Sequence, residues 1–176
     1  MPESSDTGHD ARLQALEARV RLLEDHIALY QAVSSYGPQV DSLQHEQATA
    51  LWTDGGQYVG DTRTMRGRAE IQAMLDGDVH RGLVADGCAH VMSLPLLRID
   101  GDHAIGLGYH RLFHRTADGF ELHRLVASRW DWVRTTHGWK AHQRTHRLID
   151  GGDAARELLR DSCREILRQE PGEGPR

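Results

Sequence analysis

The sequence has 176 residues, of which 39% are hydrophobic and 27% are charged, and this length suits a single domain with one core. A formal net charge of −5 and twelve scattered histidines leave no basic stripe for a phosphate backbone, which argues against nucleic-acid binding. No apolar run approaches the roughly 20 residues of a membrane helix, and the acidic, polar start does not resemble a signal peptide. We therefore expect a cytoplasmic protein with no membrane or nucleic-acid partner, whose two cysteines, Cys88 and Cys163, are free thiols.

The N-terminal part of the chain predicts one long helix. Residues 1–10 are polar and are expected to form a disordered lead-in. From Ala11 the apolar residues follow alternating steps of three and four, and proline ends the pattern near Gly37-Pro38. The residues of this stripe are Leu13, Leu16, Val20, Leu23, Ile27 and Tyr30. Its first half has the spacing of a coiled-coil seam, so it either pairs with another subunit or packs on its own domain; both remain open.

Shorter elements follow this helix. A second helix is expected over Ser42–Leu51 and a short strand over Gln57–Val59, after a turn at Asp54-Gly55-Gly56. Gly67–Leu75 has the composition of a third helix. The polar, glycine-containing segment Asp76–Ala89 shows no clear periodicity and predicts a loop at the rim of a pocket.

The apolar pattern then changes to a period of two. Turn sequences rich in glycine and aspartate separate four expected strands, which would form an antiparallel meander. These strands are Ala89–Ile99, His103–His114, Phe120–Arg134 and Trp139–Ile149. An amphipathic helix over Asp153–Arg168 and a loose tail around Glu170-Pro171-Gly172 complete the chain. The predicted class is α+β, with a curved antiparallel sheet wrapped around the first helix so that both apolar faces are buried.

Six short stretches also stand in an order typical of one superfamily. They are Tyr36-x4-Asp41, Leu51-Trp52-Thr53-Asp54, Gly67-x3-Ile71, His90, the hairpin of residues 99–104, and Gly138-Trp139-x4-Arg144. In these features the chain resembles the SnoaL-like branch of the nuclear transport factor 2-like superfamily, over about residues 16–150. The resemblance implies a cone-shaped barrel domain at residues 11–150, a C-terminal helix and tail at 151–176, a deep apolar pocket, and a homodimer or homotrimer.

The resemblance also implies catalytic residues. Enzymes of this branch, such as scytalone dehydratase, place an aspartate from the end of the first helix beside a histidine of the first long strand; Asp41 and His90 match these positions. An imidazole exchanges protons near neutral pH, and a carboxylate on its other nitrogen orients it and stabilises the imidazolium. His90 would then be the general base and Asp41 its partner. The alternative is a purely structural role for His90, as a hydrogen-bonded histidine of the core.

Other polar residues are candidates to contact a substrate. His110 would face the cavity as a second catalytic group that protonates a leaving hydroxyl or polarises a carbonyl, or else it points outward; His114 has the same parity on the strand. Tyr58 is expected to bind a substrate oxygen or to pack in the core. Tyr36 is expected mainly to pack near the helix end. Arg144 either reaches the pocket or belongs to a solvated row of charged side chains.

The expected function is that of a cofactor-independent lyase of the dehydratase type, or a related elimination or carbon–carbon cleavage, on a hydrophobic ring-bearing molecule. The alternatives are an isomerase or cyclase of the same fold and a non-catalytic small-molecule-binding module. No nucleotide-binding motif is present. Histidines four apart on a strand lie about 13 Å apart, too far to share one metal ion. We therefore expect neither cofactor nor metal.

Overall fold

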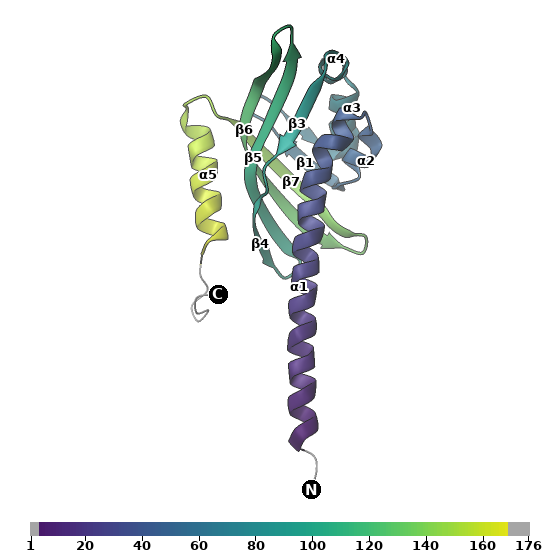
Figure 1. The fold of residues 1–176 in the computed structure, drawn as a ribbon, viewed down its shortest axis with the longest axis vertical. Helices are drawn as coiled ribbons and strands as arrows, with labels where there is room; N and C mark the ends of the chain where they lie inside the picture. Colours follow the sequence, from purple (N-terminus) through teal and green to yellow (C-terminus); the bar gives the residue numbers. More distant parts are fainter. Residues whose placement is uncertain (1–3, 169–176) are drawn as a thin grey trace.

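The computed structural model describes the backbone of residues 4–168 and the side chains of residues 8–168. Its first element is a helix that extends well beyond the body of the molecule (Figure 1). This helix, α1 (Ser4–Asp41), begins before the expected start at Ala11, so the prediction of a disordered lead-in is wrong for residues 4–10. Residues 1–3 lie outside the described part of the chain.

α1 also continues past the proline that was expected to end it. Pro38 lies inside the helix, in its last turn, where the missing N–H removes one intrahelical hydrogen bond. The N–H of Ser42 still donates to the Pro38 carbonyl at 3.1 Å, and Val40 is fully buried. Packing of this last turn on the sheet therefore outweighs the lost hydrogen bond and carries the helix to Asp41.

The segment after α1 forms a short helix and a strand that is longer than expected. α2 (His45–Thr49) is shorter than the predicted Ser42–Leu51, and β1 (Trp52–Val59) passes straight through the predicted turn at residues 54–56. The glycine pair serves a bulge, because the pairing of β1 shifts register between Trp52 and Gln57. A Cβ on Gly56 would lie 2.7 Å from Trp52 Cδ1, so a larger residue would not fit there.

A short edge strand and two helices follow β1. β2 (Thr64–Arg66) pairs with β1, and α3 (Gly67–Asp76) occupies the predicted third helix. The predicted loop over Asp76–Ala89 is wrong: it contains α4 (Asp78–Asp86). Asp78 favours the helix start, and Gly87, at a φ of 97°, ends it in a conformation that favours glycine.

The remaining strands complete one curved, unclosed sheet. Its seven strands follow the order β2-β1-β7-β6-β5-β3, and β4 pairs with β5 off this path. The predicted strand Ala89–Ile99 is in fact two strands, because the segment between them contains Pro95, which cannot donate to a ladder. The strands are β3 (Cys88–Met92), β4 (Leu96–Asp100), β5 (His103–Thr116), β6 (Gly119–Thr135) and β7 (Gly138–Leu148).

The pairing confirms the antiparallel meander and adds one parallel contact. Strands β3 to β7 pair antiparallel with their neighbours as predicted, whereas β1 lies parallel to β7. The buried residues Leu29, Val33, Tyr36 and Val40 of α1 pack with the tryptophans of the sheet, so the core lies between the helix and one sheet face. The α+β class and the sheet curved around α1 are thus confirmed, with a sheet that is mixed and does not close.

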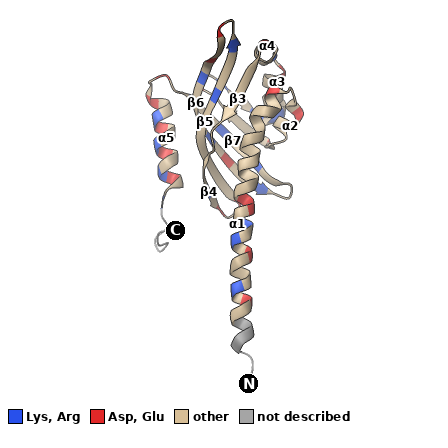
Figure 2. Ribbon diagram, in the orientation of Figure 1, with Lys and Arg blue, Asp and Glu red and all other residues tan. Residues whose placement is uncertain are grey.

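The C-terminal helix covers the other face. α5 (Asp153–Ile166) stands beside β5 and β6 in Figure 1, and Arg129 of β6 donates to Glu165 at 2.6 Å. Figure 2 shows acidic and basic residues interspersed along α5 and along the projecting part of α1. Within residues 4–168 no helix is long and apolar enough to cross a membrane. The predicted loose tail at residues 170–172 lies outside the described residues.

Candidate functional site

A cavity of about 720 Å³ opens between the concave sheet face and the helices α3 and α4. This size suits a small organic molecule, since ligand pockets run from about 300 to 1,000 Å³. Its apolar lining includes Met65, Met74, Leu75, Leu83, Leu112 and Leu148. Its polar lining includes two tyrosines and four histidines, Tyr36, Tyr58, His80, His90, His110 and His146. The arrangement is a mainly apolar pocket with a few polar groups, as small-molecule sites usually are.

Asp41 and His90 are in direct contact beside this cavity. The end of α1 meets β3 closely, because a Cβ on Gly37 would collide with the backbone carbonyl of His90. His90 Nδ1 lies 2.5 Å from Asp41 Oδ1, and the backbone N–H of His90 donates to Asp41 Oδ2 at 2.7 Å. Since a carboxylate only accepts, this contact assigns the proton to Nδ1 and leaves the lone pair on Nε2. His90 lines the cavity and Asp41 lies behind it.

The same contacts set the charge of Asp41. Burial alone would raise the pKa of its carboxyl, but the hydrogen bonds from the His90 ring and backbone outweigh burial and lower that pKa below its usual value. Asp41 is therefore ionised at neutral pH. A half-buried carboxylate paired with one imidazole nitrogen is an arrangement that can orient a histidine base and stabilise its protonated form.

Cys88 completes this small cluster. Its thiol donates to Asp41 Oδ1 at 3.5 Å, and burial together with the nearby carboxylate raises the pKa of the thiol to about 11. Asp41, Cys88 and His90 offer three ligand atoms within 4.8 Å of one another, a spacing that a metal ion could use. However, two ligands of one zinc ion stand roughly 3.3 Å apart, and the thiol must ionise. The short Asp41–His90 contact and the protonated thiol fit hydrogen bonding better than metal ligation.

His110 of β5 packs against His90 of the neighbouring strand β3 on the concave face of the sheet. The two rings stack with centroids 5.3 Å apart at an interplanar angle of 28°. Arg144 Nη2 lies 3.0 Å from His110 Nδ1; an arginine only donates, so Nδ1 accepts and the proton is on Nε2. Burial, with the Arg144 charge second, holds the pKa of His110 far below its usual range. His110 is thus a neutral imidazole whose Nε2–H has no partner among the described residues.

Arg144 is fully buried, so the expectation of a solvated charged row is wrong for it. The pairing of β6 with β7 shifts register, with Trp132 opposite Ala141 and Asp131 opposite Gln143. This bulge at His142 turns the following residues over, so that Arg144 shares the inner face with Ala141. The guanidinium packs over Trp130 at 4.5 Å and over Tyr36 at 4.8 Å, and it donates to Ser128 Oγ at 3.2 Å. Arg144 does not line the cavity itself; it acts on His110.

The two tyrosines have different surroundings. Tyr58 Oη shares a hydrogen bond of 2.8 Å with Nδ1 of His146, and burial lowers the pKa of His146 to about 3. Tyr36 packs edge-on against Trp52 and Trp130 in the core, in line with its expected packing role, and burial raises the pKa of its hydroxyl. Both tyrosines also line the cavity.

Of the predicted residues, His114 lies apart from the site, and two cavity residues, His80 and His146, were not predicted. His114 does not line the cavity; it lies 3.8 Å from Asp86 and beside the ring of His123. His146 was missed because the bulge that turns it inward leaves no mark in the alternating pattern. His80, on the unpredicted helix α4, hydrogen-bonds the Val40 carbonyl at 3.0 Å and stands 5.5 Å from the ring of His90.

Comparison with known proteins places this site in a family. The SnoaL-like domain model matches residues 21–145. A crystal structure of an NTF2-like protein with a cystatin-like fold from Novosphingobium aromaticivorans is 40% identical over 84% of this chain and 96% of its own, with a TM-score of 0.82. No curated protein matches the sequence.

More distant structures share the fold alone. A protein of unknown function from Mycobacterium tuberculosis is 19% identical over 86% of this chain and 94% of its own, with a TM-score of 0.63. A Catenulispora acidiphila protein solved in complex with S-DNPA is 17% identical over 72% and 94%, with a TM-score of 0.58. From the domain match and the first of these structures, the chain belongs to the SnoaL-like family of the nuclear transport factor 2-like superfamily.

Proposed function

We propose that the protein is a cofactor-independent lyase of the dehydratase type that acts on a hydrophobic, ring-bearing carbonyl compound. SnoaL-like domains include lyases, isomerases, cyclases and non-catalytic binders, so the family by itself leaves the choice open. The observation that carries the proposal is the environment of the His90 ring. Its Nδ1 is hydrogen-bonded to Asp41, and the residue lines a mainly apolar cavity. The two cysteines are free thiols, which accords with the reducing cytoplasm where we expect the enzyme to act.

The first step is removal of a proton from the carbon next to the carbonyl. His90 Nε2 takes this proton, and the electron pair of the C–H bond forms an enolate. The carboxylate of Asp41, 2.5 Å from Nδ1, stabilises the imidazolium that results. Because the surrounding cavity is largely apolar, the interaction between the two charges is stronger than it would be in water.

His110 is suited to stabilise the enolate. Its Nδ1 is occupied by Arg144 and its Nε2–H has no partner among the described residues, so it can donate a hydrogen bond to an oxygen that gains negative charge. Its low pKa excludes a role as a proton-donating imidazolium near neutral pH. Of the two roles expected for His110, the electrostatics therefore favour polarisation of a carbonyl.

The second step expels the leaving group. The enolate pair forms the new C=C bond, the C–O bond to a β-hydroxyl breaks, and the proton held by His90 Nε2 goes to the departing hydroxide as water. Burial lowers the pKa of the cavity residues His80, His110 and His146, so these three are neutral near pH 7 and carry no imidazolium proton to give to the leaving group. Tyr58, hydrogen-bonded to His146, is the candidate to hold the leaving oxygen.

The same observation favours one second candidate, an isomerase or cyclase. If the substrate carries no leaving group, the protonated His90 returns the proton to another carbon, or the enolate attacks a second carbonyl in the ring-bearing substrate. Both reactions need only the base, its carboxylate and the hydrogen bond from His110. A binding module without catalysis would need none of the three.

Solvent-exchange experiments separate these functions. A panel of hydroxylated cyclic and polycyclic ketones is incubated with the protein in D₂O, and mass spectrometry follows loss of water and uptake of deuterium. A lyase releases water, an isomerase or cyclase gives a product of unchanged mass apart from deuterium, and a binder gives neither. His90→Ala should reduce turnover by about a hundredfold to ten-thousandfold, whereas His114→Ala, the matched variant outside the cavity, should not. Wild-type rates in His90→Ala would rule out His90 as the base.

A further inference from the structure

The projecting half of α1 carries an apolar stripe that nothing in the described chain covers. Five large side chains, Leu13, Leu16, Val20, Leu23 and Ile27, expose between 47% and 63% of their surface. The N-terminal part of α1 extends away from the body in Figure 1, and Leu23 and Ile27 flank Asp25, where the helix first contacts the sheet. The match to the SnoaL-like domain begins only at residue 21, so much of this stripe lies outside the shared domain. Contiguous exposed apolar surface of this kind marks an interaction site.

The stripe has the residue pattern of a two-stranded coiled coil. In a heptad that starts with Leu13 at position a, Val20 and Ile27 occupy the following a positions and Leu16 and Leu23 occupy d. Branched Val and Ile at a with Leu at d favour two parallel helices over three or four. Leu13 is the one exception among the a positions.

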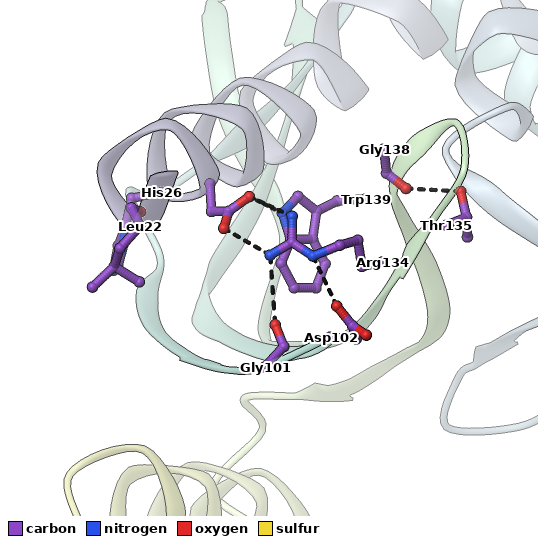
Figure 3. A network of polar contacts seen from close by, with 9 residues as sticks. Leu22, His26, Gly101, Asp102, Arg134, Thr135, Gly138 and Trp139 are labelled. Atoms are coloured by element: carbon purple, nitrogen blue, oxygen red, sulfur yellow. Dashed lines mark hydrogen bonds and ion pairs between the residues drawn. The ribbon is translucent and has the colours of Figure 1, made fainter. Parts of the chain in front are cut away.

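The body of the molecule leaves this seam free. The α1 residues that pack into the core, Leu29, Val33, Tyr36 and Val40, belong to the c and g positions. Asp25, at the outer position f, accepts bonds from Arg134 and from Trp139 Nε1 at 2.7 and 2.9 Å. Figure 3 shows Arg134 and Trp139 stacked in this network beside the turn at Gly101 and Asp102. The domain is therefore fastened through the c, f and g positions of α1, whereas the a and d side chains from Leu13 to Ile27 are exposed.

Charges beside the seam specify the partner and its direction. The g positions carry Arg12 and Arg19, and the e positions carry Glu17 and Glu24. All four are exposed and form no ion pair with another described residue. In a parallel pair of identical helices, each g residue faces the e residue five positions later on its partner, which brings Arg12 to Glu17 and Arg19 to Glu24. In an antiparallel pair arginine would face arginine and glutamate would face glutamate.

We propose that two copies of this chain associate through residues 12–30 of α1 as a parallel, in-register, two-stranded coiled coil. A seam of under three heptads would be marginal for free peptides, because helix nucleation is unfavourable. Here α1 is anchored to the sheet from Leu29 onward, so the helix exists before association and only the seam has to form. None of residues 12–30 lines the cavity.

Sedimentation of the full chain at micromolar concentration tests the seam. The wild type should have about twice the mass of the variant Leu16→Asp/Leu23→Asp, which places charges at two d positions. The matched control is Gln14→Asp/Arg21→Asp, which introduces the same residue at two exposed b positions and should keep the wild-type mass. Circular dichroism shows whether the variants are folded. A monomeric wild type, or an unchanged mass in Leu16→Asp/Leu23→Asp, would overturn the proposal.

Cross-linking tests the direction. With Leu13→Cys, a parallel in-register pair brings the two new thiols together, so mild oxidation should give a covalent dimer; Ala18→Cys, at an outer f position, should remain uncross-linked. The wild type controls for Cys88 and Cys163. Mixing Arg12→Glu/Arg19→Glu with Glu17→Arg/Glu24→Arg should restore a dimer that neither forms as well alone. Equal cross-linking of both cysteine variants, or none in Leu13→Cys, would contradict the parallel arrangement.

Discussion

Replacement of Asp41 by asparagine removes the carboxylate that orients His90 while keeping the size of the side chain. In the native site both oxygens accept, one from the His90 ring at 2.5 Å and one from its backbone N–H at 2.7 Å. The amide of asparagine offers only one accepting oxygen and turns an NH₂ donor toward the other contact. The imidazole then either loses its partner or takes the tautomer with the proton on Nε2, which cannot act as a base.

The expected loss of activity is large. An asparagine that selects the wrong tautomer in the serine-protease triad lowers kcat about ten-thousandfold, and we expect a loss of about a thousandfold or more here. Each hydrogen bond to a charged group contributes about 1.5–3 kcal/mol, and the Asp41 side chain remains 21% exposed, so we expect a loss of stability of about 2–4 kcal/mol. The variant should therefore remain folded at room temperature but melt earlier.

The measurement combines turnover with denaturant unfolding. The matched control is Asp76→Asn, because Asp76 makes the same kind of contact with Nδ1 of His45 at 2.8 Å and neither residue lines the cavity. It should lose some stability and retain wild-type turnover. Turnover in Asp41→Asn within tenfold of the wild type would refute the orienting role of Asp41, as would an equal loss of turnover in Asp76→Asn.

Three further predictions concern packing and charge around the site. Gly37→Ala should destabilise the fold by about 1–3 kcal/mol in urea unfolding because its Cβ meets a strand carbonyl, whereas Gly8→Ala, with open space around it, should not; equal effects would contradict the close contact. His110 and His146 have pKa values lowered by burial, so they take up protons more readily when unfolded, and stability should fall as pH drops from about 7 to 5; constant stability over this range would contradict their burial as neutral groups. Arg144→Met should raise the pKa of His110 in an NMR titration, provided that melting shows a folded variant, and an unchanged titration would show that Arg144 does not control His110.

Local sequence determined the elements whose signals are periodic or tied to turns. The stripe on α1 and the hairpin signals before β5, β6 and β7 predicted those elements closely, because each depends on neighbouring residues alone. The pairing of Asp41 with His90 was also predicted, from the resemblance of six short stretches to one superfamily. The structure places that pair in contact; its chemistry remains a proposal.

Only the tertiary structure decided the elements that packing imposes against local preference. Pro38 stays inside α1 because Val40 is buried beneath the sheet, and β1 crosses Gly55-Gly56 because β7 pairs with it from far along the chain. The bulge at His142 turns Arg144 into the core, where its hydrogen bond to Nδ1 selects the tautomer of His110. A single extra residue in one strand reverses which side chains face inward, and no pattern within that strand records it. The contact of Asp41 with His90 could therefore be predicted from the chain, whereas the neutral state of His110 and its hydrogen bond from the buried Arg144 required the fold.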